Sequence, residues 1–151
     1  MLKHTMTYPD FNDNQVTKTF YFNLTKAEII ELEADTPGGF GAQLQRIVES
    51  GSVPDMIKEF KNIILLSYGV KSDDGESFVK SEDLRQKFVS TAAYAELYTK
   101  LATDDKFAVE FITAVLPSDI QEEIKKANTI RANESSNATL PPPPPQSTEF
   151  A

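Results

Sequence analysis

Apolar and polar residues alternate over the first part of the chain with the two-residue period of β-strands. Phe20, Phe22 and Leu24 share one face of a run rich in β-branched and aromatic residues, and a shorter run of this kind lies upstream. Turn-forming residues at positions 9–15 separate the two runs. The pattern predicts a β-hairpin over residues 3–24. Because an isolated hairpin is only marginally stable, we expect its apolar face to pack against other elements.

From Thr25 onward, the apolar residues recur at the three- and four-residue steps of helices. Thr25 and Glu28 have the spacing of a capping box, which predicts a helix that ends within residues 35–39. A short helix follows at 41–49. The strongest helical pattern covers residues 55–68, and Gly69 is its predicted C-cap. The core-facing stripe of this helix comprises Met56, Ile57, Phe60, Ile63, Ile64 and Tyr68.

Polar residues 71–77 predict a turn, after which we expect Phe78 and Val79 to pack back onto the core. Ser81 has cap chemistry for a helix to residue 89, and a further helix is predicted over 91–101. Asp104 or Asp105 caps the next predicted helix, which stops at Pro117. The capping-box spacing of residues 118–121 predicts a final helix to about residue 131, with Lys125 and Lys126 in its basic last turn. The fold class is therefore mainly α, with five to seven helices and an N-terminal β-hairpin.

The last twenty residues differ in composition from the rest of the chain. Residues 132–151 hold five of the nine prolines, all within positions 141–145, and contain only Leu140 and Phe150 as bulky apolar groups. Such a segment buries too little apolar surface to offset the entropy of ordering it. We therefore expect one helical domain over residues 1–131 and a disordered, proline-rich C-terminal tail over residues 132–151.

Charge and composition narrow the function classes. The chain has 15 Lys and Arg against 23 Asp and Glu, a net charge of −8, so a broad basic surface for nucleic acid or an anionic membrane is not expected. The first eleven residues lack the apolar run of a signal peptide, and no apolar run approaches the length of a membrane-spanning helix. A cytoplasmic protein without nucleic-acid or membrane partners is expected.

No set of residues predicts a reactive centre. The absence of cysteine and the single histidine, His4, exclude thiolate and multi-histidine metal sites. His4 is a poor general base because it lies near a terminus that we expect to fray. Acidic clusters at residues 10–14 and 73–76 are explained by turn formation. We expect no catalytic residues, no metal, no cofactor and no enzymatic activity.

Aromatic residues exceed what a small core obviously requires, and Tyr and Phe are favoured anchors at protein interfaces. These side chains also fit amphipathic core stripes, so each has a simple packing explanation. As a set they make a protein-binding module the leading class. The candidate partner-binding residues are Phe60, Tyr94, Tyr98, Phe107 and Phe111.

Several segments resemble the tail assembly chaperones of long-tailed bacteriophages of Gram-positive hosts. Residues 19–28 (TFYFNLTKAE) are similar to the beginning of that family's pattern. The family's central helix is resembled by residues 58–60 (KEF), 63–65 (IIL) and 67–69 (SYG). The loop that follows this helix in the family is resembled by residues 72–75 (SDDG), Phe78 and residues 80–81 (KS). Residues 93–94 (AY), Leu97 and 101–104 (LATD) resemble its next helices. The resemblance spans about residues 16–117 and rests on structural motifs, not catalytic ones.

The resemblance implies a role in viral morphogenesis. Such chaperones bind the tape measure protein and keep it soluble while the tail tube assembles, which implies a location in the host cell cytoplasm and absence from the mature virion. The resemblance also implies that a longer form of the chain, made by a ribosomal frameshift, is a partner. The proline codons at 141–145 are a candidate slippery tract for this frameshift. The tail tube protein and a second copy of the chain are further candidate partners.

Two other classes stay open at this stage. A structural head–tail or tail component would be retained in the virion, whereas a chaperone would be missing from it. A small adaptor would use the proline run at residues 141–145 to bind an aromatic groove, because such runs form polyproline-II helices.

Overall fold

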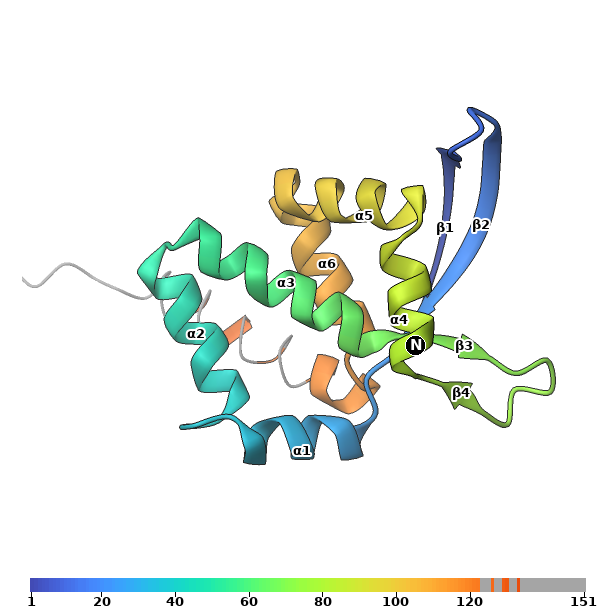
Figure 1. Cartoon of the computed structure of the whole chain (residues 1–151). Helices are drawn as coiled ribbons and strands as arrows, with labels where there is room; N and C mark the ends of the chain where they lie inside the picture. The colour runs from blue at the N-terminus through green and yellow to red at the C-terminus, as the bar shows by residue number, and fades with distance from the viewer. Residues whose placement is uncertain (123–125, 127–128, 131–132, 134–151) are drawn as a thin grey trace, which may run out of the picture. The chain divides into compact units, whose positions relative to one another are not determined.

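The computed structural model describes residues 1–122, 126, 129–130 and 133, and within these bounds the fold is mainly α with an N-terminal antiparallel hairpin, as predicted (Figure 1). Residues Met1–Gln121 form one compact unit, to which the following description applies. Its elements in chain order are β1 (Leu2–Pro9), β2 (Gln15–Phe22), α1 (Lys26–Asp35), α2 (Phe40–Ser50), α3 (Val53–Ser67), β3 (Tyr68–Lys71), β4 (Phe78–Val79), α4 (Glu82–Val89), α5 (Ala92–Thr103) and α6 (Asp105–Val115).

The β1–β2 hairpin confirms the two-residue pattern of the sequence. β1 and β2 are antiparallel and pair in a register that places Thr5 opposite Thr19 and Thr7 opposite Thr17. The hydroxyls of each threonine pair are hydrogen-bonded at 2.8 Å, and all four residues except the half-buried Thr19 are exposed. The opposite face carries Phe22, which is fully buried against the helices. The hairpin thus has one polar face and one face that belongs to the core.

Local capping signals place the helix starts where the sequence predicts them. In α1, Glu28 donates its amide to Thr25 Oγ1, and the Glu28 carboxylate accepts the amide of Thr25, a complete capping box. Ser81, Thr91 and Asp104 accept the corresponding amides at the starts of α4, α5 and α6. These three caps lie within residues 81–104, and the second of the helices they start, α5, packs next to β1.

The segment after α3 differs from its prediction. Gly69 is not a helix C-cap; it lies in β3, where it pairs with Tyr21 of β2, and β3 continues into a second hairpin with β4. A side chain at Gly69 would meet the Phe78 ring, since a Cβ there would lie 2.6 Å from Phe78 Cε1. The expectation that Val79 packs onto the core is wrong, because Val79 is 51% exposed. Strand pairing with β2, a contact distant in sequence, outweighs the local helix-ending signal.

The core lies between the hairpin and the helices. Its largest fully buried apolar side chains are Phe22, Phe88, Ile64, Leu97 and Val115. Met56, Ile57 and Phe60 of the predicted α3 stripe are only half-buried, whereas Ile63 and Ile64 are buried.

The C-terminal predictions are tested only in part. Residues 118–122 are helical, which agrees with a helix start near Ser118. The side chain of Gln121 does not close a capping box there; its amide donates to the carbonyls of Leu116 and Ala114. Lys125, the end of the predicted helix near residue 131 and the proline run at 141–145 lie outside the described residues. The boundary at 131–132 stays a prediction.

Candidate interaction surface

The predicted aromatic residues fall into separate groups around α5 and α6. Tyr94 and Tyr98 lie one turn apart on α5 with their rings stacked at 5.8 Å, and Tyr94 meets Phe88 of α4 edge-on at 5.5 Å. Both tyrosines are half-buried. Burial raises the pKa of Tyr94, and the neighbouring Tyr98 adds to the shift. The pair thus presents a partly covered aromatic surface with its rings already held in place.

Phe107 and Phe111 of α6 form the second group. Phe111 is only 3% exposed and packs edge-on against Phe22 at 5.0 Å, so its ring is part of the core. Phe107 is half-buried and carries the ammonium of Lys100 at 4.1 Å from its ring centre. Phe60 of α3 is half-buried against the core cluster, and no ring contact joins it to either group. The structure therefore does not gather the five predicted residues into one patch.

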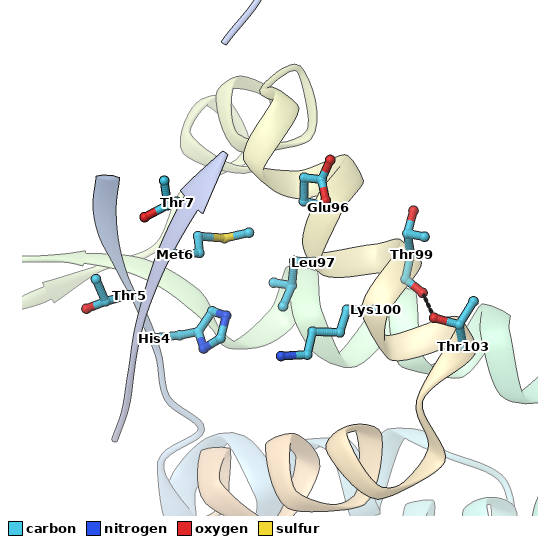
Figure 2. A pocket seen from close by; sticks show the side chains of 9 residues that line it. All are labelled: His4, Thr5, Met6, Thr7, Glu96, Leu97, Thr99, Lys100 and Thr103. Atoms are coloured by element: carbon cyan, nitrogen blue, oxygen red, sulfur yellow. Dashed lines mark hydrogen bonds between the residues drawn. The ribbon is translucent and has the colours of Figure 1, made fainter. Parts of the chain in front are cut away.

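A groove of about 470 Å³ runs between β1 and α5 (Figure 2). Figure 2 shows His4 and Met6 of β1 directed toward α5, whereas Thr5 and Thr7 point to the other face of the strand. Thr5 and Thr7, which alternate with His4 and Met6 along the strand, also line the groove. Sequence reasoning missed this groove, although the alternating pattern of β1 was visible.

Charged residues line the α5 side of the groove. Glu96 and Lys100 are exposed and four residues apart, the arrangement in which a helical Glu–Lys pair usually forms an ion pair. Here Lys100 lies over Phe107 instead, and within the described part of the chain neither Glu96 nor Lys100 makes an ion pair. Both charges are thus available to an approaching molecule.

His4 lies at the end of the groove nearest Lys100, with its ring 5.6 Å from that of Phe107. Burial, and then the positive charge of Lys100, lower the pKa of His4 below its ordinary value. The expectation of a frayed terminus at His4 is wrong, because the residue sits in a paired strand opposite Phe20. The structure therefore packs the His4 ring against the aromatic side chains of Phe107 and Phe111.

The acidic residues at the β1–β2 turn include one with a structural role. Asp10 accepts the amides of Asn12 and Asn14 and so closes the β1–β2 turn, which explains the acidic cluster there. In the described residues, no three His, Asp or Glu side chains gather as a metal site would require. No helix in that same part of the chain has the length and apolar character needed to span a membrane.

Comparison with known proteins identifies the family of this chain. The sequence pattern of a family described as phage tail assembly chaperones matches residues 1–150. The chain belongs to this family. No curated protein and no solved structure matches the chain.

Membership confirms the resemblance and extends it beyond residues 16–117 to almost the whole chain, including the β1 strand and the segment after α6. The family's description assigns the chain a role in assembling phage tails. This description implies that the role is non-catalytic. It also implies contact with tail proteins.

Proposed function

We propose that this chaperone binds the tape measure protein and keeps it soluble while tail tube subunits polymerise around it. The observation that carries the proposal is the family match over residues 1–150. A long, amphipathic client needs apolar and aromatic surface to cover its own. Tyr94, Tyr98 and Phe107 supply such surface from two neighbouring helices. The net charge of −8 favours solubility of the complex and disfavours binding to nucleic acid.

Co-expression with the tape measure protein of the same phage tests the proposal. We expect the soluble fraction of the tape measure protein to rise when the chaperone is present. We also expect the two proteins to copurify. A Leu97→Asp variant is the negative control, because it places a charge at a side chain only 1% exposed and should unfold the chaperone. Equal client solubility with wild type, Leu97→Asp and empty vector would contradict the proposal.

Single substitutions separate binding from folding. We expect Tyr98→Ala to lower the amount of copurified client, because interface tyrosines are frequent anchors. Tyr21→Ala is the matched control: Tyr21 is also half-buried, but it lies on β2 under Lys71 and not on α5. Similar losses in both variants would show that the aromatic surface of α5 is not the contact.

The location of the protein follows from the same proposal. A chaperone acts in the host cell cytoplasm and leaves before the particle is complete, so purified virions should lack the chain. Its presence in virions at a fixed copy number would favour the structural tail component instead. A longer, frameshifted form is part of the proposal as well, and the nucleotides that encode residues 141–145 should contain a slippery cytosine tract.

A further inference from the structure

The turn that joins β1 to β2 presents an exposed phenylalanine. Phe11 is 82% exposed, the highest fraction of any large apolar side chain among the described residues, and residues 12–15 beside it are exposed as well. The Phe11 ring lies outside the core cluster and makes no ring contact within the part of the chain that the structure describes. Figure 1 shows this turn at the free end of the hairpin, away from the helices. The ring therefore contributes nothing to the packing of the fold.

The turn holds the backbone of Phe11 in place without using its side chain. One oxygen of the Asp10 carboxylate accepts the amides of Asn12 at 2.8 Å and Asn14 at 3.0 Å. Two backbone hydrogen bonds close the same loop, from the Asp10 amide to the Asn14 carbonyl and from the Asp13 amide to the Asp10 carbonyl. Asp13 has a φ of 62°, which Asp and Asn adopt more readily than most residues. Turn formation thus accounts for the Asp and Asn residues of the loop but not for the phenylalanine.

Single exposed apolar side chains are common on protein surfaces, and most need no explanation. Ile30 of α1 and Val109 of α6 are of this kind, with exposed fractions of 68% and 65%. Phe11 differs from them in two ways. Its aromatic ring is larger and is of a type enriched at the centre of protein interfaces. Its backbone is also fixed before any partner arrives, so less conformational entropy is lost when a partner covers the ring.

We propose that the hairpin tip, residues 10–14, is a docking site that places the Phe11 ring on an apolar stripe of the client flanked by Lys or Arg. The charge of the tip selects this chemistry, because Asp10 and Asp13 lie on either side of Phe11 and residues 5–17 contain no Lys or Arg. An amphipathic client carries apolar stripes between polar faces, and basic side chains on those faces would pair with the tip. The inference rests on the proposed function for the identity of the client, whereas the exposure and fixed backbone of Phe11 are features of the structure.

A second copy of the chain is a poorer occupant than the client. The chain has a net charge of −8, so an acidic tip would approach an acidic molecule. The groove between β1 and α5 has the carboxylate of Glu96 as well as the ammonium of Lys100 in its wall, so it does not offer a basic rim to the tip. Charge complementarity therefore favours a client that is basic where it meets the tip.

Dilution of denatured tape measure protein into rising concentrations of the full chain tests the proposal. The measured quantity is the chaperone concentration that keeps half of the client soluble, and Phe11→Ala should raise it about tenfold. Since the side chain packs on nothing, urea unfolding of Phe11→Ala should match that of the wild type. Ile30→Ala is the matched control, because it removes another exposed apolar side chain and should leave the half-maximal concentration unchanged. Equal values for wild type and Phe11→Ala, or equal losses in Phe11→Ala and Ile30→Ala, overturn the proposal.

The flanking charges have a test of their own. Asp13→Asn removes one carboxylate and keeps a residue suited to a positive φ. At low salt it should raise the half-maximal concentration about twofold, and at about 0.5 M salt the difference from the wild type should vanish, because salt screens exposed charges. Asp73→Asn removes an exposed carboxylate from the β3–β4 turn and should have no effect. The same effect from both substitutions would show that the tip does not recognise basic residues, and would overturn this part of the proposal.

These outcomes are distinguishable from failure of the proposed function. If wild type and Phe11→Ala keep the client soluble equally well, the docking proposal fails and the proposed function stands. If the wild type does not keep the client soluble at all, the proposed function itself fails. A wild-type dimer in analytical ultracentrifugation that Phe11→Ala converts to a monomer would show that the tip binds a second copy, and would overturn the choice of the client.

Discussion

Lys80 joins three parts of the chain that are distant in sequence, and its removal is a sharp test of the structure. Its ammonium donates to Glu28 Oε1 at 2.5 Å and to the carbonyl of Asn23 at 2.6 Å. The same Glu28 carboxylate accepts the amide and hydroxyl of Thr25 and completes the α1 capping box. Lys80 is 11% exposed and Glu28 33%. The cluster therefore fixes the end of β2 and the start of α1 to the chain that follows β4.

The substitution Lys80→Met keeps the length and apolar stem of the side chain and removes its charge. Each hydrogen bond to a charged group contributes about 1.5–3 kcal/mol when it is shielded from water. In the variant, water can reach the partly exposed Glu28 carboxylate, which also keeps its hydrogen bonds to Thr25. The variant also avoids the free-energy cost of removing the lysine ammonium from water on folding. Both effects reduce the loss, so we expect the free energy of unfolding to fall by about 2 kcal/mol.

Urea unfolding followed by far-ultraviolet circular dichroism measures this change, with Lys106→Met as the matched control. Lys106 pairs with Glu110 at 3.9 Å, and their side chains are 87% and 64% exposed. Such a surface pair contributes at most about 0.5 kcal/mol. If Lys80→Met costs no more than Lys106→Met, the buried ion pair does not hold these elements together and the reasoning is refuted.

The pH dependence provides an independent check on the same cluster. Burial alone would raise the pKa of Glu28, but the hydrogen bonds from Lys80 and Thr25 outweigh it and hold the pKa below its ordinary value. The folded state therefore favours the charged carboxylate, and its contribution is present above the ordinary pKa of glutamate and lost as the pH falls through the folded pKa. The difference between wild type and Lys80→Met should shrink below about pH 5. A difference that grows on acidification would contradict the assignment.

Two further predictions concern the second hairpin and the groove. Gly69→Ala should lower the free energy of unfolding by about 1–3 kcal/mol because its Cβ would overlap the Phe78 ring. Gly41→Ala in α2, where a Cβ meets nothing within 4 Å, should raise it by up to about 1 kcal/mol, and equal effects in urea unfolding would contradict the packing at β3. For His4, burial and Lys100 lower the pKa, so the folded state disfavours protonation. Wild type should lose more stability than His4→Gln when urea unfolding is compared at about pH 7.5 and about pH 5, and equal losses would show that His4 is not enclosed.

Short-range patterns account for the elements that were predicted correctly. The capping box of Thr25 and Glu28, and the caps at Ser81, Thr91 and Asp104, each involve residues three apart, so the sequence contains the whole signal. The β1–β2 hairpin likewise depends on two adjacent runs and the turn between them. Gly69 could not be assigned in this way, because its partner Tyr21 lies far away in sequence and the Phe78 ring that covers it comes from another strand.

The amino-acid sequence by itself determined the helix starts, the first hairpin, the acidic charge and the resemblance to tail assembly chaperones, since all of these depend on neighbouring residues or on composition. Only the tertiary structure decided which aromatic side chains are covered, because Phe111 and Phe107 have the same chemistry and differ in what packs on them. It alone also placed Glu96 and Lys100 of α5 in one groove with His4 and Met6 of β1. The physical reason is that burial and grooves arise from contacts between segments that are distant along the chain, and no local pattern records those contacts.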